Sequence, residues 1–154
     1  MNEITERIFE AHVRKQIAQK ILPHRSDLIL MNSKKAVDIM ICRNGETPAL
    51  YLIEVKFHKS KHGRLGFGSS KGIGFQPEIL LKMPDYFSRY MKWVIGEESR
   101  GIHEFAVLDN YEMQQFVSGG KVGEKHNNIQ KLIFTQVDWL TEQQLVTRLL
   151  EWLQ

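Results

Sequence analysis

Three side chains that could act together in catalysis, Asp38, Glu54 and Lys56, lie within or at the start of short apolar runs. Glu54 and Lys56 interrupt the run Leu50–Phe57, which is otherwise typical of a buried strand. Because alternate residues of a strand share a face, these two charged side chains should point the same way. Asp38 belongs to the preceding β-like run, residues 37–42.

A hairpin would bring Asp38 and Glu54 together. Asn44-Gly45 is a turn signal, and it separates the two β-like runs. If the apex lies near Glu46, residues pair when their numbers add up to 92, so Asp38 faces Glu54. Directly opposed residues on one face have Cβ atoms roughly 4.5–5.5 Å apart.

Two carboxylates at this separation repel each other unless a cation lies between them or one of them binds a proton. The pair suits a hard divalent cation, Mg²⁺ with Mn²⁺ as a substitute, which prefers carboxylate oxygens. Such an ion polarises a phosphoryl oxygen and lowers the pKa of a bound water. Lys56 would orient that water or neutralise charge developing on the phosphate. These residue types therefore predict hydrolysis of a phosphodiester.

The pattern resembles the motif of the PD-(D/E)xK nuclease superfamily: Asp38, fifteen intervening residues, and Glu54-Val55-Lys56 closing an apolar strand. The resemblance covers residues 37–57 and, more loosely, the helix predicted before them. It implies a restriction-endonuclease-like fold, a metal ion bound by Asp38 and Glu54, and a Lys56 that assists the attacking water. Val37 stands where the family has proline, a residue that supplies no ligand.

The resemblance also implies a glutamate from the N-terminal helix. A helix over residues 3–22 is predicted by apolar residues at every fourth position, namely Phe9, Val13, Ile17 and Ile21. Glu6 and Glu10 both lie along this stripe, where a carboxylate is unexpected. We favour Glu10, which lies deeper in the helix, as a catalytic residue and keep Glu6 as the alternative.

Two other interpretations of the triplet stay open. Glu54 and Lys56 could form a surface ion pair on an edge strand. The chain could also be a DNA-binding module that keeps the fold but does not cut, although such a module has no reason to retain all three residues. His58 and His62 have no third soft ligand nearby in the sequence, so we do not expect zinc there.

Positive charge is concentrated directly after the strand that carries the triplet. The chain has a net charge of +3, yet residues 55–83 contain six basic residues and one acid. Five glycines fall within residues 63–74, so residues 58–75 should form a long basic, glycine-rich loop. A polyanion such as DNA is the partner that this asymmetry favours. The residues predicted to contact DNA are Lys59, Lys61, Arg64, Ser69, Ser70, Lys71 and Gln76.

The rest of the chain predicts the elements that position these residues. Strands are expected at 27–31, 37–42, 50–57, 92–95, 105–108 and 131–137. Helices are expected at 3–22, 77–91 and 111–117, and after Thr141, whose spacing to Gln144 is that of a capping box. This order predicts an α/β fold, a central mixed β-sheet flanked by α-helices, in a single domain over residues 1–154.

Length and composition fit this fold class. The chain has 154 residues, 42% of them hydrophobic and 25% charged, as in soluble globular domains. We identify no apolar stretch near the roughly 18 residues of a membrane span and no signal-peptide pattern. The single cysteine, Cys42, cannot form an internal disulfide, which favours the cytoplasm.

We therefore expect a Mg²⁺-dependent DNA endonuclease of the type II restriction kind. Cutting both strands at a symmetric site would call for a homodimer. The alternative is a structure-specific nuclease, such as a Holliday junction resolvase or a DNA repair enzyme, with the same metal site.

Overall fold

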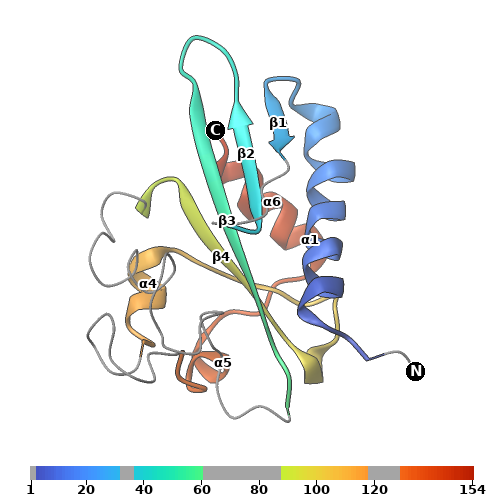
Figure 1. Ribbon diagram of the computed structural model, residues 1–154, viewed down its shortest axis with the longest axis vertical. Helices are drawn as coiled ribbons and strands as arrows, with labels where there is room; N and C mark the ends of the chain where they lie inside the picture. The colour runs from blue at the N-terminus through green and yellow to red at the C-terminus, as the bar shows by residue number, and fades with distance from the viewer. Residues whose placement is uncertain (1–2, 32–36, 61–87, 118–128) are drawn as a thin grey trace.

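A computed structural model describes residues 3–31, 37–60, 88–117 and 129–154 (Figure 1). The strands are β1 (Leu28–Met31), β2 (Ile39–Arg43), β3 (Ala49–His58), β4 (Met91–Glu97) and β5 (Ala106–Leu108). The α-helices are α1 (Glu6–Lys20), α4 (Asn110–Gln114), α5 (Ile133–Gln136) and α6 (Glu142–Trp152). Two 3-10 turns, η1 (Leu22–His24) and η2 (Glu98–Arg100), complete the described elements.

Within the described residues the strands form one mixed sheet in the order β1-β2-β3-β4-β5. Neighbouring strands are antiparallel except β3 and β4, which are parallel. The predicted α/β fold with a central mixed sheet is thus confirmed. β3 lies between β2 and β4, so it is not an edge strand.

The predicted hairpin is formed by β2 and β3. Its turn contains Gly45, whose φ of 127° lies in the region that favours glycine. Ile39 pairs with Ile53, so residues pair when their numbers add up to 92, as the sequence predicts. The last five residues of β3, 54–58, continue past β2 while still pairing with β4. One edge of this end of β3 therefore faces no described strand.

Helix α1 packs lengthwise on one face of the sheet, with its N-terminal end near the C-terminal end of β3 (Figure 1). Thr5 caps the helix by accepting a hydrogen bond from Ile8 N at 3.2 Å. The ring of Phe9 lies so close to Gly96 of β4 that a Cβ there would be 2.5 Å from it. This close approach holds the first turns of α1 against the end of β4, where Gly96 pairs with Phe57 of β3.

The two faces of the sheet have separate apolar cores. On one face, α1 and α6 pack against a core that includes Ile53, Val55 and Phe57 of β3. On the other, α4 and α5 pack against a core that includes Leu52 of β3 and Trp93 of β4. The alternation along β3 therefore places the even-numbered residues, among them Glu54 and Lys56, on the face opposite to α1.

The C-terminal helix begins as predicted. Thr141 Oγ1 accepts from Gln144 N at 3.2 Å, and Gln144 Oε1 accepts from Thr141 N at 2.8 Å, which is a capping box. The described helices include none with the length and apolar character needed to cross a membrane.

The predicted strand over residues 131–137 is wrong, because this segment forms the short helix α5. Ile133 and Phe134 are adjacent and both buried in one core, whereas a strand would point them to opposite faces. The predicted helix over 77–91 and the glycine-rich loop lie largely outside the described residues. Met91, the last residue expected in that helix, instead begins β4.

Candidate active site

Two carboxylates accept hydrogen bonds from the backbone of β3 in the part of the strand that extends beyond its pairing with β2. Val55 N donates to Asp38 Oδ2 at 2.7 Å, and Phe57 N donates to Glu6 Oε2 at 3.1 Å. A strand edge needs acceptors for its N–H groups, and these two side chains supply them in place of a neighbouring strand. Asp38, directly before β2, and Glu6, in the first turn of α1, are therefore fixed at the same edge of β3.

Glu54 and Lys56 lie beside this edge and are almost completely buried, each 3% exposed. Continuing the hairpin register by one residue places Asp38 opposite Glu54, and the two side chains are hydrogen-bonded. Charged side chains are rarely buried to this degree unless they have charged or hydrogen-bonding partners. The alternative of a surface ion pair on an edge strand is therefore wrong.

The pKa of Glu54 is raised to about 9, and burial is the largest cause. The negative charge of Asp38, the hydrogen bond between the two side chains and the charge of Glu6 contribute to this rise, whereas Lys56 opposes it. Burial also raises the pKa of Glu6, while Lys56 and the Phe57 N–H group lower it. Since each of these charges affects the others, the side chains share one electrostatic site.

The structure brings Glu6, rather than Glu10, onto β3. Glu10 Oε1 accepts from Arg14 Nε at 3.2 Å, and Arg14 also donates to the backbone oxygen of Asp38. Glu10 still lies near enough for its charge to raise the pKa of Glu6. The spacing of Glu10 and Arg14, four residues apart on a helix, is a signal in the sequence that Glu10 has another partner.

The residues predicted to contact DNA lie mostly outside the described part of the chain. They are Lys61, Arg64, Ser69, Ser70, Lys71 and Gln76. Lys59 is described, and its ammonium group forms an ion pair with Glu3 at the N-terminal end of the chain. The positive charge of Lys59 is thus partly neutralised by Glu3, so Lys59 is less available for a phosphate contact than the sequence predicts.

The residue types gathered at this site are ones that could hold a hard divalent cation. Asp38, Glu54 and Glu6 can carry three negative charges against the single positive charge of Lys56, and all four lie at the end of β3. Searches among protein-family models, curated proteins and solved structures found no match to this chain.

Proposed function

We propose that the protein is a Mg²⁺-dependent endonuclease that hydrolyses phosphodiester bonds in DNA. The observation that carries the proposal is the convergence of Asp38, Glu54 and Lys56 at the end of β3, joined there by Glu6. The site thus combines acceptors for a cation with a buried ammonium group beside them.

Asp38 and Glu54 are the residues that would hold the ion. Their oxygens are the ligands that Mg²⁺ and Mn²⁺ prefer, and an ion between them would offset the repulsion that, together with burial as the larger cause, raises the pKa of Glu54. When bound, Mg²⁺ would polarise a phosphoryl oxygen and help to deprotonate a water molecule.

The chain's own groups have separate tasks in this proposal. The Val55 N–H group orients the Asp38 carboxylate, and the Phe57 N–H group orients that of Glu6. Lys56, which is almost completely buried, would donate to the attacking water and oppose the negative charge that develops on the phosphate. Because these groups are already fixed by the sheet, little reorganisation would be needed during the reaction.

The resemblance to PD-(D/E)xK nucleases agrees with this distribution of roles, including the glutamate from the first helix. Within that superfamily we propose a type II restriction enzyme that acts as a homodimer, which would place two sites on the two strands of a symmetric target. We also propose that it works in the cytoplasm, where the unpaired Cys42 would stay reduced.

The test is incubation of the purified protein with linear phage DNA, with supercoiled plasmid and with a four-way junction, each with Mg²⁺ or with EDTA. We expect discrete fragments from linear duplex only when Mg²⁺ is present. Cleavage confined to the junction would instead identify a structure-specific nuclease. DNA binding without cleavage in Mg²⁺ or Mn²⁺ would overturn the enzymatic proposal in favour of a non-cutting DNA-binding module.

A further inference from the structure

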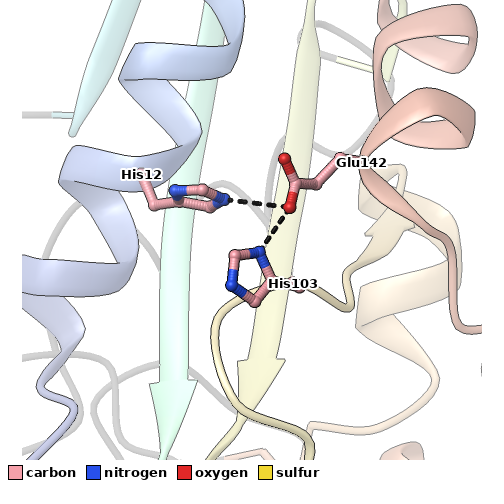
Figure 2. A group of neighbouring side chains, drawn as sticks. All are labelled: His12, His103 and Glu142. Carbon is pink, nitrogen blue, oxygen red and sulfur yellow. Dashed lines mark hydrogen bonds and ion pairs between the residues drawn. The ribbon is translucent and has the colours of Figure 1, made fainter.

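A second group of polar side chains lies between α1 and the start of α6 (Figure 2). It consists of His12 from α1, His103 from the segment between η2 and β5, and Glu142, the first residue of α6. One potential ligand atom from each residue lies within 4.8 Å of the others. Three segments distant in sequence thus bring potential ligand atoms close together.

The three ligand atoms are close enough together to surround one small metal ion. His12 Nε2 lies 3.6 Å from Glu142 Oε1, and His103 Nδ1 contacts the same carboxylate oxygen. Zinc bonds of about 2.0–2.1 Å in a tetrahedron separate the ligand atoms by about 3.3 Å. Small side-chain adjustments would therefore place an ion at bonding distance from all three residues. Nitrogen donors favour Zn²⁺ over Mg²⁺, which prefers oxygen.

The surroundings hold two of the ligands in place. The His12 ring stacks on Phe105, with centroids 5.9 Å apart and planes 7° apart. Lys20 Nζ lies 3.6 Å from Glu142 Oε2, the carboxylate oxygen that does not face the histidines. One carboxylate oxygen is thus turned to a cationic side chain and the other to the two imidazoles. Such outer contacts are the usual means of orienting metal ligands.

A buried amide next to the cluster is the second, independent observation. Gln16 is 3% exposed, and its Nε2 lies 3.4 Å from His12 Nε2. Its Oε1 is buried and has no hydrogen-bond partner among the described residues. Because the positions of the amide oxygen and nitrogen can be exchanged by turning the group over, this oxygen can face the cluster as a further potential metal ligand.

We propose that His12, His103 and Glu142 bind a divalent transition-metal ion, with Zn²⁺ the best match, and that the ion fastens α1 to α6 and to the segment before β5. The site is chemically and spatially separate from the acidic site. At 100° per residue around the helix axis, the mean direction of His12 and Gln16 lies about 60° to one side of the mean direction of the buried residues Phe9 and Val13. The mean direction of Glu6 and Glu10 lies about 60° to the other side.

The test is calorimetric titration of EDTA-treated protein with Zn²⁺ in an excess of Mg²⁺, together with thermal unfolding. We expect one Zn²⁺ per chain and a rise in the unfolding midpoint, because an ion that binds only the folded state stabilises it. His103→Ala should weaken binding by at least about 10- to 100-fold, the cost of losing even an outer-shell contact. The His103 side chain is 68% exposed, so its removal should leave the fold intact.

Matched variants separate this site from other zinc-binding groups. His24→Ala removes an exposed histidine in η1 and should change neither affinity nor stoichiometry. Asp38→Asn should keep the zinc affinity, since Asp38 belongs to the acidic site. Glu142→Gln should weaken zinc binding as His103→Ala does. Equal zinc binding in wild type, His103→Ala and Glu142→Gln, or no binding in wild type, would overturn the proposal.

Discussion

The acidic cluster at the end of β3 and the histidine cluster on the opposite flank of α1 share one helix but differ in construction. Asp38 and Glu6 are anchored by backbone N–H groups of β3, and Glu54 and Lys56 are nearly inaccessible to water. His103 and Glu142 are held by contacts between side chains, and His103 is largely exposed. Backbone anchoring suits a site whose geometry must be fixed during a reaction, whereas side-chain contacts suffice for an ion that joins elements.

The strongest way to separate the two clusters is to remove a ligand from one of them. Asp38→Asn or Glu54→Gln should reduce DNA cleavage by at least about 100-fold, since losing a single electrostatic contact to the transition state already costs this much. DNA binding should persist or strengthen slightly, because a negative charge near the phosphate is removed. Initial cleavage rates with Mg²⁺ and gel-shift titrations with Ca²⁺ measure the two effects.

The matched control is Glu46→Gln, which neutralises an exposed glutamate in the hairpin turn. It should cleave as wild type does. If Asp38→Asn or Glu54→Gln stays within a few-fold of wild type, the nuclease proposal fails, whatever the histidine cluster binds.

A second change acts on DNA binding and should touch neither cluster. Replacing Lys61, Arg64 and Lys71 together by Ala removes up to three phosphate contacts. The slope of log affinity against log salt should become shallower by up to roughly 2.7, at about 0.9 for each contact. Lys59→Ala alone should change the slope less than one full contact does, because Lys59 already pairs with Glu3.

Fluorescence anisotropy with labelled duplex at several salt concentrations gives these slopes. The same slope in the triple variant and in wild type would mean that DNA is held by another surface. Zinc binding serves as the control, because it should be the same in both proteins.

The roles of the two helical glutamates can be ranked by neutralising each in turn. Glu6→Gln should lower cleavage by about tenfold or more, as expected for a group that positions metal ligands. Glu10→Gln should cost only a few-fold, because Glu10 is bound to Arg14. Single-turnover rates at saturating Mg²⁺ measure the difference. A larger loss in Glu10→Gln would restore the assignment that the sequence favours.

The last expected effect is on stability and depends on pH. Because burial raises the pKa of Glu54 from 4.5 to about 9, the metal-free folded state keeps a proton that the unfolded chain releases. The contribution of this group is full below pH 4.5 and is lost as pH rises to about 9. The free energy of unfolding should fall by up to about 1.4 kcal/mol per pH unit in this range. The raised pKa of Glu6 adds a slope of the same sign.

Urea unfolding in EDTA at several pH values tests this slope. Glu54→Gln should flatten it, because the amide does not titrate. Parallel curves for wild type and Glu54→Gln would show that Glu54 is not the group that titrates.

The acidic cluster was predictable in large part because it is local. The alternation in residues 50–57 and the Asn44-Gly45 turn determine the hairpin register, which in turn opposes Asp38 to Glu54. The choice between Glu6 and Glu10 needed tertiary information, namely which turn of α1 reaches the edge of β3 that faces no described strand. Periodicity alone placed both on the same stripe.

The other differences also arise from tertiary packing. Residues 131–137 alternate like a strand, but burying the adjacent Ile133 and Phe134 in one core favours the helical turn of α5. The histidine cluster gave no local signal, because its members lie at positions 12, 103 and 142 and meet only through the packing of α1 against α6. Sequence spacing can reveal ligands within one hairpin but not those collected from three elements.

The extension of β3 past β2 has a consequence for solubility. An unpaired strand edge is a template onto which a strand of another molecule can add. Asp38 and Glu6 occupy the N–H donors of Val55 and Phe57 and place carboxylates along that edge, so they block strand addition there. The side chains proposed for chemistry thus also protect the sheet from self-association, and variants that lack them should be more prone to form aggregates through β3.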